Sequence, residues 1–175
     1  MEWFRKFFKR TPRGDSLFPG KRLRIDQILQ LKKPTAMIIE LSYGIADKIH
    51  KTGYDSLSIP EQVLHHVYWL ESEVNNGGFH QYFYNSSGDY ALDTPGALDQ
   101  IGAHHTAKLL RRAIELFPGG PPPRDLQQRR EQLDSLSEAA RAKLEKLDSE
   151  FYEYHDPLEE LQVKYMLAHQ EQIQV

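Results

Sequence analysis

The sequence predicts an all-α fold: a multi-helix globular domain preceded by a basic N-terminal arm. From residue 34 onward, apolar residues recur three and four positions apart, which places them on one face of a helix. Clusters of Pro, Gly and Asn separate these stretches, and no stretch alternates apolar and polar residues as a half-buried strand does. We therefore expect the arm and its linker over 1–33 and the helical domain over 34–175.

The first two helices of the domain have clear start and stop signals. Thr35 is expected to cap a helix that ends near Gly53. The sequence Ser58-Ile59-Pro60-Glu61 predicts the start of the second helix, with Pro in the first turn, where its missing N–H costs nothing. The run Asn75-Asn76-Gly77-Gly78 is expected to end this helix, since Gly and Asn tolerate the left-handed backbone conformation.

The middle of the chain predicts shorter elements. Residues 79–85 are expected to form a short helical or irregular aromatic segment, followed by a turn over 86–88. Asp93-Thr94-Pro95 announces a further helix, and residues 101–117 are expected to be helical with a possible break at Gly102. The proline-rich run over 118–123 interrupts the helical pattern.

Three helices are predicted in the last third of the chain. They cover residues 124–133, residues 137–154 and residues 158–170. Asp156-Pro157 is expected to cap the last of them.

Composition excludes several classes of protein. The 175 residues contain no cysteine, which excludes disulfides, thiolate zinc sites and a cysteine nucleophile and suits a cytoplasmic location. The longest apolar runs have four residues, far fewer than a membrane-spanning helix needs. Residues 1–33 hold ten Lys and Arg against three acids, a net of +7, whereas residues 34–175 hold 12 against 22, a net of -10. This asymmetry suggests different partners for the arm and the domain.

The arm can form an amphipathic helix over residues 1–12. Its aromatic residues would occupy one arc and its cations another; they are Trp3, Phe4, Phe7 and Phe8 against Arg5, Lys6, Lys9 and Arg10. Such a helix could lie on an anionic membrane surface and make the protein peripheral to the membrane. Docking of the aromatic residues on the domain, or a disordered basic terminus, is the alternative.

Catalytic and metal-binding motifs are absent from the sequence. There is no nucleophile elbow, no phosphate-binding loop and no zinc-binding His-Glu-x-x-His helix. The pairs His65-His66 and His104-His105 are adjacent, so their side chains point about 100° apart on a helix and suit one metal ion poorly. Glu71 lies near an apolar stripe, where burial would raise its pKa, but pairing with a neighbouring donor is the commoner role. We therefore expect no catalytic residues, no metal and no cofactor.

Residues 71–85 form the most informative stretch. Their amides and glycines specify a packed turn rather than a simple helix end, because the amides can bond loop carbonyl and N–H groups. The residues singled out are Glu73, Asn75, Asn76, Gly77, Gly78, Phe79, Gln81, Tyr82, Phe83 and Asn85. The alternative is a pocket for a substrate or small molecule, with walls from Glu73, Asn76, His80, Gln81 and Tyr82.

These residues also resemble a known family of small bacterial proteins that is associated with a DNA-mimic protein. The matching residues are 73–79, 81–83, Asn85 and Gly88, with similarity in kind through the helix that ends at Phe117. The resemblance implies an all-helical, non-enzymatic domain that can form homodimers. In the namesake of the family, an acidic surface takes the place of DNA on a DNA-binding partner.

An acidic cluster near the end of the chain is the candidate for such a surface. No Lys or Arg occurs from 147 to 163, and the carboxylates there are Asp148, Glu150, Glu153, Asp156, Glu159 and Glu160. Carboxylates arrayed like phosphates attract a basic groove. We expect this cluster to bind a protein partner and the domain itself to bind no nucleic acid. The resemblance implies that this partner is a DNA-binding protein. Two alternatives stay open. One is another protein-binding role, and the other is an enzyme or small-molecule binder that uses the 75–83 turn.

Overall fold

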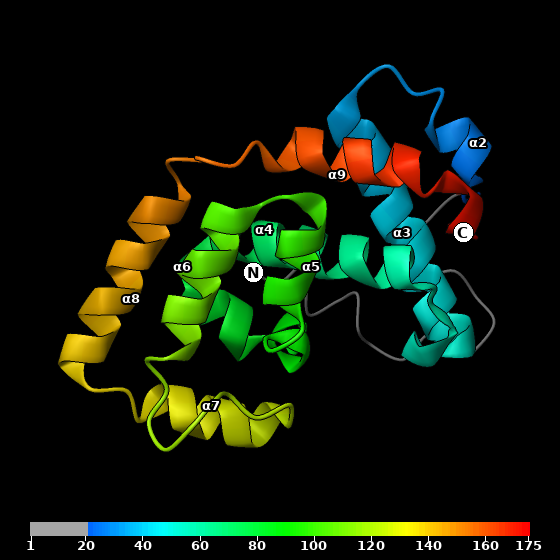
Figure 1. Ribbon diagram of the computed structural model, residues 1–175. Coiled ribbons are helices and arrows are strands. Elements are labelled where there is room, and N and C mark those ends of the chain that lie inside the picture. Colours follow the sequence, from blue (N-terminus) through cyan, green and yellow to red (C-terminus); the bar gives the residue numbers. More distant parts are fainter. Residues whose placement is uncertain (1–20) are drawn as a thin grey trace.

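The computed structural model describes residues 21–175, and every regular element within them is a helix, which confirms the all-α prediction (Figure 1). The elements, in chain order, are α2 (Ile25–Ile28), α3 (Pro34–Thr52), η1 (Tyr54–Ser56), α4 (Ile59–Tyr84), η2 (Ser86–Tyr90), α5 (Thr94–Ile101), α6 (His104–Ile114), α7 (Leu126–Asp134), α8 (Glu138–Phe151), α9 (Leu158–Ala168) and η3 (Gln170–Gln172). The arm helix expected over residues 1–12 lies outside the described residues.

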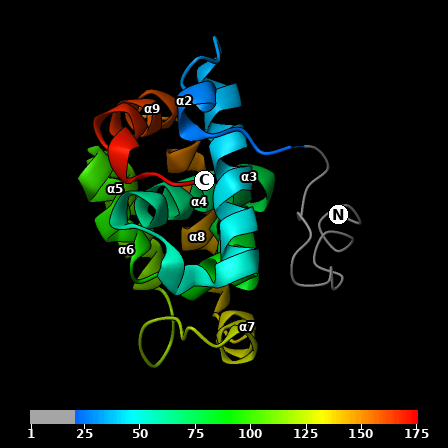
Figure 2. The ribbon, with the colours of Figure 1, turned by 90° about the vertical axis from the view of Figure 1, so that its right-hand side faces the viewer.

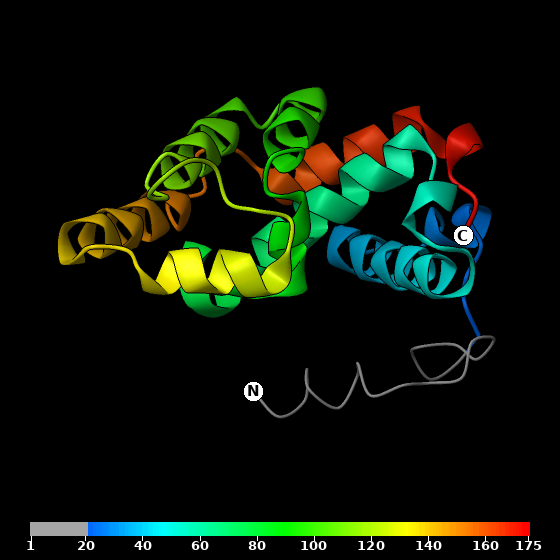
Figure 3. The ribbon, with the colours of Figure 1, turned by 90° about the horizontal axis from the view of Figure 1, so that it is seen from below.

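Helix α4 is the longest element and connects the two ends of the molecule. Figures 1 and 3 place α3 toward one end and α8 at the other, with α4 between them. The N-terminal part of α4 packs near α3, and its C-terminal part contacts α5, α7 and α8. Helix α9 returns across the molecule toward α3.

Two buried apolar clusters hold these helices together. The larger one combines α4, α5, α6 and α8 and includes Leu70, Phe79, Leu98, Leu110 and Leu147. Apolar residues on one face of each helix leave water together here, and this burial is the main favourable term in folding.

The smaller cluster joins α2 and α3 to α4 and α9. It includes Ile28, Leu41, Ile45, Leu64 and Met166. Ile28 is fully buried although α2 falls within the 1–33 segment that the sequence analysis separated from the domain. The last residues of that segment therefore form part of the folded body.

Several predicted helix ends differ from the structure, three of them for reasons that the contacts explain. Helix α3 begins at Pro34 with Lys33 as its N-cap, and Thr35 instead donates a hydrogen bond from Oγ1 to Glu159. Helix α8 ends at Phe151 rather than at residue 154, since the backbone of Tyr154 adopts a left-handed conformation with φ 49°.

A further difference concerns Asp156, which does not cap α9. The N-cap of α9 is Pro157, and the carboxylate of Asp156 accepts hydrogen bonds from Thr106 at the start of α6. Sequence rules for helix caps consider only the residue directly before a helix, so they cannot predict that a distant loop caps α6.

Candidate functional site

The 71–85 stretch forms a bend inside α4. The sequence analysis expected the helix to end at the glycines and a short helical segment to follow, and the backbone is non-helical at Gly77 and Gly78 before α4 continues to Tyr84. Gly78 has φ 71° and ψ -176°, a conformation that favours glycine. The helix is thus interrupted and then restarted in a new direction at Phe79.

Asp148 from α8 explains how the helix restarts. Its Oδ1 accepts a hydrogen bond from the backbone N–H of Phe79 at 2.7 Å, so the carboxylate satisfies a donor that the break in the helix leaves free. A Cβ added to Gly78 would collide with the same carboxylate. Burial raises the pKa of Asp148 above its usual value, and the hydrogen bond from Phe79 opposes that rise.

Glu73 bridges the two arms of the bend. It is buried, and its Oε2 accepts hydrogen bonds from Gln81 Nε2 at 2.6 Å and from Asn85 Nδ2 at 2.8 Å. Glu73 precedes the glycines and both amides follow them, so these bonds fix the angle of the bend. This geometry gives three polar residues of the motif a structural task.

The aromatic residues of the motif anchor the bend in the larger cluster. Phe79, Tyr82 and Phe83 are fully buried. The hydroxyl group of Tyr82 lies 2.9 Å from Thr94 Oγ1, and the ring of Phe83 meets Phe117 edge-on with centroids 4.7 Å apart. The bend therefore sits on a filled core.

Not all residues of the motif point inward. Asn75 and Asn76 are exposed, and Asn75 Nδ2 donates to the hydroxyl group of Tyr154. His80 is exposed as well and stacks on Tyr84 with centroids 6.0 Å apart.

The five residues of the suggested pocket therefore do not line one common cavity wall but lie in different environments. The structure brings Glu73 and Gln81 together by a hydrogen bond, places Tyr82 in the core, and leaves Asn76 and His80 exposed. These contacts favour a structural role for the bend. A ligand site there stays an untested prediction.

Glu71 is also engaged within the protein. Its Oε1 accepts from the hydroxyl group of Tyr154 at 3.0 Å, and its Oε2 accepts from Gln162 Nε2 at 2.8 Å. Burial raises the pKa of Glu71, and these two hydrogen bonds oppose that rise. Glu71 thus pairs with neighbouring hydrogen-bond donors, as the sequence analysis expected for the commoner role of such a residue.

Two of the six late carboxylates act as anchors for helices. Asp148 holds Phe79 as described, and Asp156 Oδ2 accepts from the backbone N–H of Thr106 at 2.7 Å and from Thr106 Oγ1 at 2.9 Å. The second contact caps α6 and fixes the loop between α8 and α9 against it. Negative charge at a helix N-terminus is stabilising, because it meets the free N–H groups and the positive end of the helix dipole.

The other four carboxylates lie nearer to solvent, from the last turn of α8 to the first turn of α9. Glu150 accepts hydrogen bonds from the two terminal guanidinium nitrogens of Arg112, and Glu153 lies 2.7 Å from His155 Nε2. Glu159 accepts from Thr35 Oγ1 at 2.5 Å, and Glu160 is exposed. The pair with Arg112 lowers the pKa of Glu150.

Two polar centres were missed by the sequence analysis. Arg129 is fully buried in α7, where Nε donates to Phe83 O at 2.7 Å and the rest of the guanidinium group binds Pro123 O, Arg124 O, Asn85 O and Asp89. The sequence contains one weak signal for this burial. Arg129 lies four residues before Leu133 and therefore on the same, buried face of a polar helix. This side chain fixes the end of α4 to α7.

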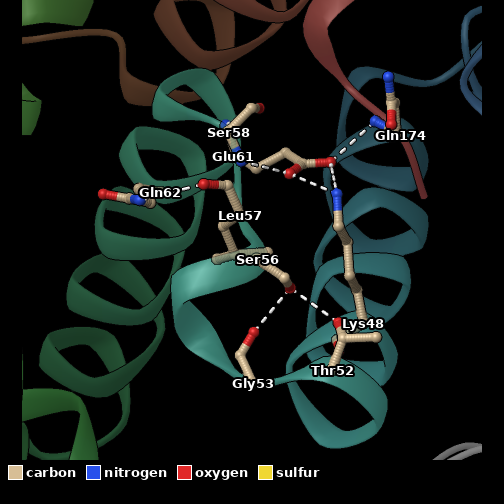
Figure 4. A network of polar contacts seen from close by, with 9 residues as sticks. All are labelled: Lys48, Thr52, Gly53, Ser56, Leu57, Ser58, Glu61, Gln62 and Gln174. Atoms are coloured by element: carbon tan, nitrogen blue, oxygen red, sulfur yellow. Dashed lines mark hydrogen bonds and ion pairs between the residues drawn. The ribbon is translucent and has the colours of Figure 1, made fainter.

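The second centre is Glu61, a fully buried carboxylate at the start of α4 (Figure 4). It accepts hydrogen bonds from Lys48 Nζ at 2.9 and 2.8 Å and from the backbone N–H of Ser58 at 2.8 Å. The spacing Ser58-x-x-Glu61 is that of a capping box and was readable in the sequence, but the partner Lys48 was not.

Two further properties of residues 21–175 bear on function. No helix among them is long and apolar enough to cross a membrane. In the same residues, no group of three or more His, Asp or Glu side chains is arranged to hold a metal ion.

Comparison with known proteins gives one match. The family model described as DMP19-like protein, after DNA mimic protein 19, matches residues 55–169. No curated protein and no solved structure shows significant similarity to the chain. The matched range contains the whole bend in α4 and all six late carboxylates. Since this range covers more than half of the sequence, the chain belongs to the DMP19-like protein family.

Proposed function

We propose that the protein is a non-enzymatic interaction module whose acidic surface binds a basic, DNA-binding protein in place of DNA. The membership of the family supports a role in protein binding. The observation that carries the proposal is the stretch from 147 to 163, which holds six carboxylates and no Lys or Arg.

The four solvent-facing members of that stretch are the ones a partner would meet. Glu150, Glu153, Glu159 and Glu160 come from the end of α8, the loop after it and the start of α9. Glu153, Glu159 and Glu160 are exposed, whereas the carboxylate of Glu150 shares its charge with Arg112. A basic groove that binds phosphates would gain attraction from the unneutralised carboxylates.

Such binding must weaken as salt is added. Attraction between exposed charges is screened over roughly 10 Å at 0.1 M ionic strength. Duplex DNA should compete, because partner and DNA would use the same basic groove.

The test compares two triple variants of the full chain, each immobilised and exposed to a cell lysate. One is Glu153→Gln, Glu159→Gln and Glu160→Gln; the control is Glu131→Gln, Asp134→Asn and Glu138→Gln, three exposed acids of α7 and the start of α8. Both lose the same charge. We expect the wild type and the control variant to retain a DNA-binding protein at about 50 mM salt and to release it by about 200 mM.

The first variant should retain clearly less of that protein, and added duplex DNA should displace it from the wild type. If both variants lose the same amount of bound partner, net charge rather than the position of these carboxylates determines binding. Retention that ignores salt, DNA and both sets of substitutions would show that the acidic surface is not the binding site.

A further inference from the structure

The segment after η3 crosses from α9 to α3 and α4 (Figure 2). Ile173 has φ -95° and ψ 120°, which is extended backbone, so side chains two residues apart point to the same side. Ile173 is buried, Val175 packs against the smaller cluster, and Gln174 between them is exposed. The segment therefore lies on the helices as a short extended peptide.

Gly44 of α3 makes room for this peptide. A Cβ built on Gly44 would lie 2.7 Å from the Cβ of Val175, which is closer than real side chains approach. Ile173 joins the same buried cluster as Leu41 and Leu64 from α3 and α4. The two aliphatic side chains thus lie in a groove between α3 and α4, with Val175 against Gly44 and Ile173 against the smaller cluster.

Glu61 provides the polar contact to the peptide backbone (Figure 4). Its Oε1 accepts from the N–H of Gln174 at 2.8 Å. Lys48 and Ser58 hold the same carboxylate by their own hydrogen bonds. The acceptor is therefore fixed in place by groups that do not belong to the peptide.

We propose that this groove is a peptide-binding site, occupied here by residues 173–175 of the same chain, and that this segment exchanges with an equal segment supplied in trans by a second copy of the chain. The site takes an extended peptide with aliphatic side chains two residues apart and a free N–H between them. A hydrogen bond from Gln174 to Glu61 joins the segment to α4, and residues 173–175 have no regular secondary structure. Groove and segment both include residues outside the 55–169 family match.

The test measures binding of a fluorescent peptide with the sequence of residues 168–175 to two forms of the full chain. In the wild type, the resident segment competes at an effective concentration in the millimolar range. In the double variant Ile173→Ser and Val175→Ser, the apolar contacts that hold the segment are lost. We expect the peptide to bind this variant at least about tenfold more tightly than the wild type, because its own competitor is weakened.

Two modified peptides test the geometry without changing the protein. N-methylation of Gln174 in the peptide removes the N–H that Glu61 accepts and should weaken binding about tenfold. A peptide with Gln174→Ala should bind like the parent, since that side chain is exposed.

Equal binding of the peptide to the wild type and the double variant, or no binding to a folded double variant, would overturn the proposal. If circular dichroism shows that the double variant does not fold, amide hydrogen exchange of Gln174 in the wild type decides. Exchange through a local opening, faster than that of core amides of α3 and α4, supports an exchangeable segment. Exchange only by global unfolding makes the segment a fixed part of the core and refutes the proposal.

Discussion

Arg129 matches all five of its N–H donors to acceptors on three other parts of the chain. It binds carbonyl groups at the end of α4, carbonyl groups before α7 and the carboxylate of Asp89 in η2. A planar guanidinium group can do this, whereas the ammonium group of lysine presents fewer donors in another geometry. Gly88 supports the arrangement, because a Cβ there would lie 2.7 Å from Arg129 Nε.

Replacing this side chain should therefore be costly. We expect Arg129→Met to lower the free energy of unfolding by about 3–5 kcal/mol, because it leaves the carboxylate of Asp89 and several buried carbonyl groups without their donor. Chemical denaturation of the purified variant measures the loss.

Arg130→Met is the matched control for this substitution. Arg130 is the next residue of α7, donates to Tyr84 O and covers the ring of Tyr84 at 4.2 Å, so its loss should cost about 1 kcal/mol or less. Equal effects of the two substitutions would show that Arg129 does not have the central role described here.

Individual residues also show what the sequence could and could not predict. The amides and glycines at 73–85 indicated a packed turn, and the short spacing of Glu73, Gln81 and Asn85 made their hydrogen bonds conceivable from the sequence. Asp148 and Arg129 lie 69 and 46 residues from the groups they bind in α4. Such contacts depend on the tertiary arrangement, and no local pattern in the sequence encodes them.

At the scale of elements, the bend in α4 depends on Gly78. Alanine there would have to adopt a φ of 71° and would push its Cβ into the Asp148 carboxylate. We expect Gly78→Ala to destabilise the protein by about 2–4 kcal/mol, from backbone strain and from the displaced cap of Phe79. Thermal and chemical denaturation measure this.

Gly96→Ala should act in the opposite direction. Gly96 lies within α5, and a Cβ there would meet no atom within 4 Å. Alanine forms helix more readily than glycine, so this control should stabilise the protein by up to about 1 kcal/mol. A Gly78→Ala variant as stable as the wild type would contradict the account of the bend.

Most helices were predictable because each has an apolar face and a local stop signal, as α5 does with Gly102 in the left-handed conformation after it. The failures at the starts of α3 and α9, and the missed cap of the helical segment that restarts at Phe79, share one cause. Thr35, Asp148 and Asp156 all make bonds to elements far away in the sequence. Local rules predicted the existence of the helices and misplaced some of the groups that cap them.

At the scale of the whole molecule, a group of aromatic rings joins η1, α4 and η2. The ring of Tyr54 is parallel to that of His66 to within 6°, and its hydroxyl group lies 2.7 Å from His66 Nε2. Tyr90 stacks on both rings, and His65 meets Tyr90 edge-on. Nδ1 of His65 is buried with no hydrogen-bond partner among the described residues.

This group should make stability sensitive to acid. Burial lowers the pKa of His65 to about 3 and that of His66 to about 4, both below the unperturbed value near 6.5. Below pH 6.5 the unfolded chain binds protons that the folded chain cannot, so the free energy of unfolding falls as the pH drops toward 4. We expect a loss of about 1–3 kcal/mol per pH unit from the two residues together.

Denaturation curves between pH 7 and 4.5 measure this dependence. His65→Phe should flatten it by removing one of the two groups, while His80→Gln, an exposed histidine of the same helix, should leave it unchanged. An identical slope for His65→Phe and the wild type would show that this imidazole does not control the response to acid.

The hydrogen bonds of Asp148 and Asp156 to the starts of distant helical segments have a consequence for any count of acidic residues in this family. A glutamate at either position would preserve the formal charge, but its additional methylene group would move the carboxylate away from the N–H group that it caps. The number of acids in such a sequence overstates the electrostatic face that the folded protein offers to its surroundings.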